Sequence, residues 1–113
     1  MRRGVATSIL MIALVSAGCS KAPPAVTVQM VNYAYRPARI TIHEGDSVLF
    51  RNASTLTHNF SLTQGGSVAF DVKSGDSTIT NKLGRLKPGT YPFKCRFHFS
   101  QGMSGVLTVE AGS

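Results

Sequence analysis

Hydrophobic and polar residues alternate in short runs along most of the chain after residue 25. Val26, Val28 and Met30 alternate with polar neighbours, and Ile40 and Ile42 repeat the pattern a few residues later. Alternation of this kind over about four to eight residues is typical of strands with one buried face. No stretch after residue 18 has a long helical periodicity. The pattern therefore predicts an all-β chain.

Turn signals separate these runs. They lie at residues 44–46, 64–66, 74–76 and 87–89, each of which contains glycine. Short strands with turns about every 8 to 12 residues favour a β-sandwich or barrel. Val68, Phe70 and Val72 predict one further strand, residues 105–110 predict the last one, and we expect no helix between residues 64 and 88.

The first 18 residues differ from the rest, because two arginines precede an apolar stretch over residues 5–15. This stretch is shorter than the roughly 20 residues of a membrane span, and it predicts an export signal peptide. Residues 15–19 resemble a bacterial lipoprotein processing site that would lipidate Cys19, whereas ordinary cleavage after Ala17 or Ala22 is the alternative. We therefore expect a signal over residues 1–18, a tether over 19–25 and one domain over 26–113, in the bacterial periplasm or anchored to a membrane facing the periplasm or the exterior.

Metal-ligand chemistry is concentrated near the end of the chain, where Cys95, His98 and Met103 follow one another at short spacing. His58 lies about forty residues upstream, in a different predicted strand whose alternation turns it towards the core. Two imidazoles, a thiolate and a weak axial thioether are the ligand set of a blue-copper electron-transfer centre, and zinc rarely takes methionine. The sequence thus predicts one type 1 copper ion, with Met103 as a plain core methionine being the alternative.

Segments over most of residues 26–110 resemble one known family. They are residues 35–42, 45–52, 58–60, 87–91 and 95–103. In this order they are similar to the cupredoxins, and among these to the small bacterial plastocyanin-like proteins. The resemblance implies a single Greek-key β-sandwich or barrel with copper at one end, and a one-electron carrier that cycles Cu(II) and Cu(I) in the cell envelope.

The same resemblance implies roles for residues beside the ligands. Asn59 would tie the segment of the first histidine to the cysteine loop, although it can also be read as a simple strand-end asparagine. His98, flanked by Phe97 and Phe99, would be the electron port and docking patch. His43 falls on the outward face of its strand, which predicts a surface histidine.

Charge adds a hint about partners. The formal net charge of the chain is +7. Loss of Arg2 and Arg3 with the signal peptide leaves ten basic and five acidic residues, which is a formal net charge of +5. A basic exported domain suggests an acidic redox partner or an anionic membrane surface, unless the charges are merely scattered and solvated. Nucleic acid is not expected, because no basic run with interleaved aromatics is present. We expect a monomer.

The sequence allows three other interpretations. A copper-binding or copper-delivery module would use the same ligands. A Cys/His enzyme with Cys95 as nucleophile and His58 or His98 as base is disfavoured, because Cys95 points inward and no orienting acid is evident, so we expect no enzyme. A disulfide between Cys19 and Cys95 is disfavoured because Cys19 lies at the edge of the export signal.

Overall fold

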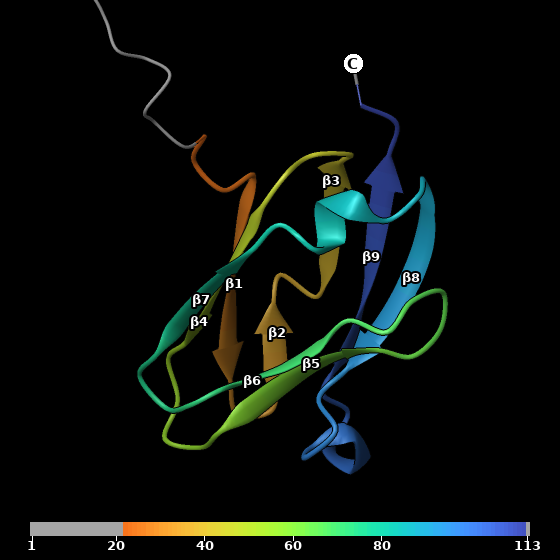
Figure 1. Cartoon of the computed structure of the whole chain (residues 1–113). Coiled ribbons are helices and arrows are strands. Elements are labelled where there is room, and N and C mark those ends of the chain that lie inside the picture. Colours follow the sequence, from red (N-terminus) through yellow and green to blue (C-terminus); the bar gives the residue numbers. More distant parts are fainter. Residues whose placement is uncertain (1–21, 113) are drawn as a thin grey trace, which may run out of the picture.

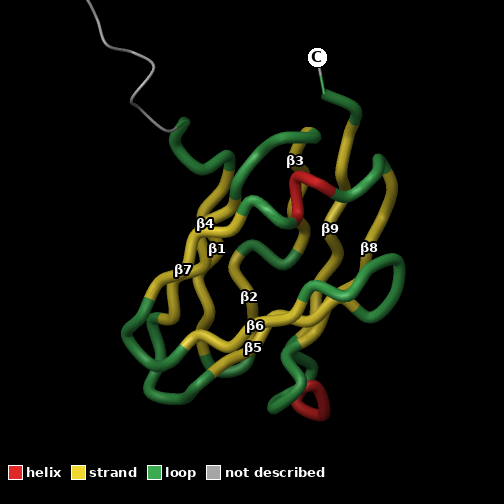
Figure 2. The backbone as a smooth tube through the Cα atoms, viewed as in Figure 1, coloured by secondary structure: helices red, strands yellow, loops and turns green. Residues whose placement is uncertain are grey.

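The computed structural model describes residues 22–112, and over this range the chain forms a β-sandwich of two sheets with two single-turn 3-10 helices (Figures 1 and 2). The elements are β1 (Val26–Val31), β2 (Ala34–Arg36), β3 (Arg39–His43), β4 (Val48–Asn52), β5 (His58–Leu62), β6 (Ala69–Val72), β7 (Ser77–Thr80), η2 (Leu83–Arg85), β8 (Gly89–Lys94), η3 (Phe99–Gln101) and β9 (Ser104–Glu110). The predicted signal peptide and Cys19 lie outside the described residues.

The two sheets have the strand orders β2-β1-β4-β7 and β3-β9-β8-β5-β6. β1 pairs in parallel with β4, and β3 pairs in parallel with β9, while the other pairs are antiparallel. Because β4 and β7 lie in one sheet and β5, β6 and β8 in the other, the chain crosses repeatedly between sheets, as Greek-key sandwiches do. The all-β, single-domain prediction is confirmed.

The core lies between the sheets, where the inward positions of the strands meet. Val28 and Met30 of β1 are fully buried, and Ile40 and Ile42 of β3 are nearly so, as the alternation predicted. Phe50, Phe60, Phe70 and Phe93 form a chain of aromatic contacts across the core, with ring centroids 4.7–5.4 Å apart. Rings at this separation gain stabilisation beyond their buried area.

The expectation of no helix between residues 64 and 88 is wrong, because η2 forms a single 3-10 turn there. Its first residue, Leu83, is fully buried and anchors the turn in the core. Gly84 permits close approach to the turn after β3, since a Cβ there would lie 2.2 Å from the carbonyl oxygen of Asp46. Three residues are too few to leave a helical periodicity in the sequence.

Both described chain ends lie at one end of the sandwich, and the loop with η3 lies at the other (Figure 1). β5 begins near that second end, so the first predicted ligand and the cysteine loop are brought to the same place. Among the described residues, none of the helices is long and apolar enough to cross a membrane.

Candidate metal centre

Three predicted ligands converge at the end of the sandwich that carries η3. The Nδ1 atoms of His58 and His98 lie 3.2 Å apart. The Sγ atom of Cys95 lies 4.0 Å from Nδ1 of His58 and 3.6 Å from Nδ1 of His98. One donor atom from β5 and two from the loop after β8 therefore face one small volume.

Strand geometry explains how these side chains meet. His58 is the first residue of β5, and Cys95 directly follows β8, which pairs with β5 through the register Ser61↔Lys94. Alternation along β8 turns Tyr91, Phe93 and then Cys95 inward, so the thiol is fully buried. His58 is fully buried too, while His98 is only partly covered. The site thus has a closed side and a side near solvent.

Backbone hydrogen bonds brace the loop between Cys95 and Met103. Cys95 N–H donates to the Met103 carbonyl at 3.0 Å, and Met103 N–H donates to the His98 carbonyl at 3.3 Å. Gly102 closes η3 at φ +89°, a left-handed conformation that glycine adopts without strain. Met103 is fully buried beneath the loop. Its backbone is therefore fixed beside both Cys95 and His98.

Burial determines the protonation of two groups in the site. Burial lowers the pKa of His58, and the neighbouring His98 ring lowers it further. The imidazole therefore favours its neutral form, which is the form that binds metals. Burial also raises the pKa of Tyr35, as does negative charge on Cys95, so this phenol keeps its proton. Its hydroxyl donates to the Asn59 carbonyl at 2.5 Å.

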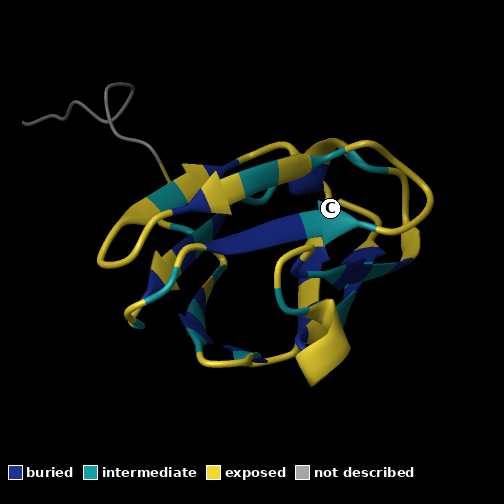
Figure 3. Ribbon diagram, turned by 90° about the horizontal axis from the view of Figure 1, so that it is seen from below, coloured by how far each residue is buried: buried dark blue, intermediate teal, exposed yellow. Residues whose placement is uncertain are grey.

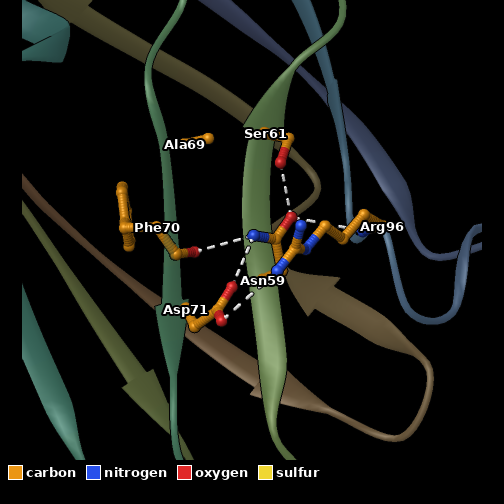
Figure 4. Close-up of a pocket in the computed structure, with 6 residues that line it drawn as sticks. All are labelled: Asn59, Ser61, Ala69, Phe70, Asp71 and Arg96. Atoms are coloured by element: carbon orange, nitrogen blue, oxygen red, sulfur yellow. Dashed lines mark hydrogen bonds and ion pairs between the residues drawn. The ribbon is translucent and has the colours of Figure 1, made fainter.

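Asn59 links three segments around the thiol. Its backbone N–H donates to Cys95 Sγ at 3.3 Å. Its side chain donates to Asp71 and to the carbonyl of Phe70, and it accepts from Ser61 and from the backbone N–H of Arg96 (Figure 4). The buried asparagine is thus hydrogen-bonded on every side, as the tie between the first histidine segment and the cysteine loop requires.

Aromatic side chains surround the partly covered His98 on the outside. Phe97 and Phe99 are 45% and 55% exposed, and Tyr33, 39% exposed, places its ring 5.0 Å from that of His98. We call Tyr33, Phe97, His98 and Phe99 the aromatic face; the adjoining η3 turn is exposed (Figure 3). Lys94 Nζ lies 4.5 Å from the Phe99 ring centroid, and Arg96 Cζ lies 4.9 Å from that of Phe97.

Similarity to known proteins identifies the family of this chain. The model of the family described as Cupredoxin-like domain matches residues 4–109. The chain belongs to the cupredoxin family. It is 32% identical over 92 residues to a plastocyanin from the fern Dryopteris crassirhizoma, covering 70% of this chain and 90% of that protein.

Solved structures show the same cupredoxin fold. A reduced amicyanin variant aligns with a TM-score of 0.62 and 26% identity over 84% of this chain and 90% of its own. A copper-containing nitrite reductase from Thermus scotoductus aligns with a TM-score of 0.67 and 25% identity over 88% of this chain. The latter match covers only 25% of the reductase, so it concerns one part of a larger protein.

Several residues that shape this cupredoxin site were not predicted from the sequence. Asp71 and Ser61 bind the Asn59 side chain, Tyr35 binds its carbonyl, and Tyr33 packs on His98. The sequence contains only a weak signal for Tyr33, which is that an aromatic residue occupies the turn between two short strands. The others depend on strand register, which the sequence does not show. His43 is exposed, as expected, and lies 3.3 Å from Glu110.

Proposed function

We propose that this cupredoxin is a one-electron carrier with a single type 1 copper ion held by His58, Cys95, His98 and Met103. The observation that supports this most is the convergence of a buried thiol and two imidazole Nδ1 atoms within 3.2–4.0 Å of one another. A buried methionine adjoins them through backbone hydrogen bonds to Cys95 and His98. Two imidazoles, a thiolate and a thioether suit copper better than zinc.

The donor spacing fits one metal ion. Zinc sites show the spacing that a small four-coordinate metal ion requires. Their metal–nitrogen and metal–sulfur bonds of about 2.0 and 2.3 Å place neighbouring donors roughly 3.3–3.8 Å apart. The three distances among His58, Cys95 and His98 fall close to this range. A bound copper ion would supply a Cu(II)/Cu(I) couple.

The surrounding protein holds the donors nearly fixed. His58 belongs to a strand, Cys95 accepts the Asn59 N–H, and the loop to Met103 is closed by its own backbone bonds. Ligands that keep their positions suit both oxidation states and limit reorganisation during electron transfer. Cys95 is fully buried, which favours a carrier over an enzyme with a cysteine nucleophile.

Electrons would leave through His98, the one of the two histidines that is near solvent. The aromatic face around it provides an apolar contact, and Lys94 and Arg96 beside its rings carry positive charge. Such a surface suits a redox partner that presents an apolar patch and carboxylates around it. The formal net charge of the whole chain, +7, is also positive and would attract the same acidic partner.

Replacing Phe99 by aspartate should slow electron exchange with an acidic partner about tenfold, because it removes an apolar anchor and adds repulsion. The copper spectrum should not change, since Phe99 is exposed and outside the ligand set. Stopped-flow mixing with a small acidic redox protein measures the rate.

Ile79→Asp is the matched control, because Ile79 is 62% exposed but lies in β7 of the other sheet. It should exchange electrons nearly as fast as the wild type. The wild-type rate should fall as salt rises, since salt screens charges over about 10 Å at 0.1 M. Equal rates for the Phe99→Asp and Ile79→Asp variants would exclude the aromatic face as the port.

We further propose that the domain works as a monomer in the bacterial envelope, tethered through lipidated Cys19. The apolar stretch over residues 5–15 and the small residues before Cys19 support export and lipidation. More than one acyl chain gives stable anchoring, so the protein should fractionate with membranes. Recovery of the unaltered protein in the soluble periplasmic fraction would contradict the lipid anchor at Cys19 but not the copper site.

Repeated oxidation and reduction of the copper-loaded protein in the presence of a Cu(I) chelator distinguishes a carrier from a copper-delivery module. A carrier should return to full visible absorbance over many cycles, because its buried donors retain the metal in both states. Transfer of copper to the chelator on each reduction would support delivery and contradict the proposed function.

A further inference from the structure

The strand beside the metal centre supplies a carboxylate that holds Asn59 in place. Asp71 lies directly opposite Asn59 in the pairing of β6 with β5. Its Oδ1 atom accepts a hydrogen bond from Asn59 Nδ2 at 2.8 Å, the shorter of the two bonds that this amide group donates (Figure 4). A groove of about 370 Å³, lined by both residues, leaves the contact reachable from solvent.

We propose that Asp71 is a positioning residue for the Cys95 thiolate and acts through Asn59, an inference that rests on the proposed function. Asn59 is the residue whose backbone N–H donates to Cys95 Sγ. Its side-chain oxygen also accepts from Arg96 N–H, directly after the cysteine. The Asp71 carboxylate therefore fixes one end of a chain of hydrogen bonds whose other end is the thiolate. Bonds that orient the ligands in this way tune the metal site.

The hydrogen bond, and not the nearby ion pair, carries this effect. Arg96 lies 3.7 Å from Asp71 Oδ2, but their side chains are 61% and 46% exposed, and exposed ion pairs contribute little. Asn59 by contrast is almost fully buried, so its amide loses a charged acceptor when Asp71 is removed. Hydrogen bonds to charged groups are stronger than neutral ones.

Two effects of Asp71 on the copper potential have opposite signs and can be separated. Its negative charge favours Cu(II) and lowers the potential. A firm N–H···S bond withdraws charge from the thiolate and raises the potential. Asp71→Asn removes the charge and keeps an acceptor oxygen, whereas Asp71→Ala removes both. The Asn variant should therefore have a higher potential than the Ala variant.

The copper-free reduced protein provides a readout that does not depend on the metal. Amide hydrogen exchange by NMR should show the Asn59 N–H exchanging at least about tenfold faster in Asp71→Ala, the lower end of the ratio expected for losing one hydrogen bond to a charged group. Asp71→Asn should restore part of the protection, because its side-chain oxygen is a weaker, neutral acceptor. Asp76→Ala removes a similarly exposed carboxylate from the turn before β7 and should change nothing. Amides of β1, in the other sheet, report any global loss of stability.

Unchanged Asn59 exchange in Asp71→Ala, or equal potentials for the Asn and Ala variants, would overturn the positioning role. A wild-type protein that binds copper without an intense visible band would instead overturn the proposed function. In that case the exchange measurement would still decide whether Asp71 holds Asn59.

Discussion

Replacing Cys95 by serine should abolish the intense visible band of the copper-loaded protein. That band arises from charge transfer between a thiolate and Cu(II), and a hydroxyl oxygen cannot supply it. The chain contains only one other cysteine, Cys19, which lies outside the described domain. Absorption spectra of both proteins with one equivalent of Cu(II) measure the loss, which should be complete.

The β-sandwich should survive this change. Serine is smaller than cysteine, and its oxygen can still accept the Asn59 N–H that Cys95 accepts. Far-ultraviolet circular dichroism should therefore match the wild type. Cys19→Ser is the matched control and should keep the full band. Full colour in Cys95→Ser, or its loss in Cys19→Ser, would refute the ligand assignment.

Replacing Met103 by glutamine should leave a coloured site with a lower reduction potential. An amide oxygen is harder than a thioether sulfur and favours Cu(II) over Cu(I). A change of about 1.4 kcal/mol in the relative affinity for the two states moves a one-electron potential by about 60 mV, and we expect a fall of at least that order. Redox titration monitored in the visible range measures it.

Met103→Leu is the companion variant, because leucine has a similar volume but no donor atom. Its potential should rise, since Cu(II) loses a weak axial ligand. The two variants should thus move the potential in opposite directions. If neither changes the potential or the spectrum, Met103 is a core methionine and the axial role is wrong.

The sequence predicted most of what brings the donors together. Alternation in β1, β3 and β9 gave the correct buried faces, because each strand has one side in the core and one in solvent. Alternation also turned His58 and Cys95 inward, and both are fully buried. The proximity of two donors 37 positions apart came from their ligand chemistry and the family resemblance, since spacing alone does not determine which strands pair.

The partners of Asn59 could not be predicted in the same way. Asp71 faces Asn59 only because β6 pairs with β5 in one particular register, and a shift by one residue would turn the carboxylate away. Tyr33 packs on His98 across a gap of 65 positions through the turn after β1. Both contacts depend on how strand ends and turns are arranged in space, which local residue patterns do not specify.

The visible spectrum of the wild-type protein, titrated with Cu(II) from the copper-free form, tests the central claim most directly. We predict an intense band that grows in proportion to added copper and saturates at one equivalent, because His58, Cys95 and His98 face a single volume. Reduction should bleach the band, and reoxidation should restore it. A saturated copper complex without an intense visible band would contradict the type 1 site.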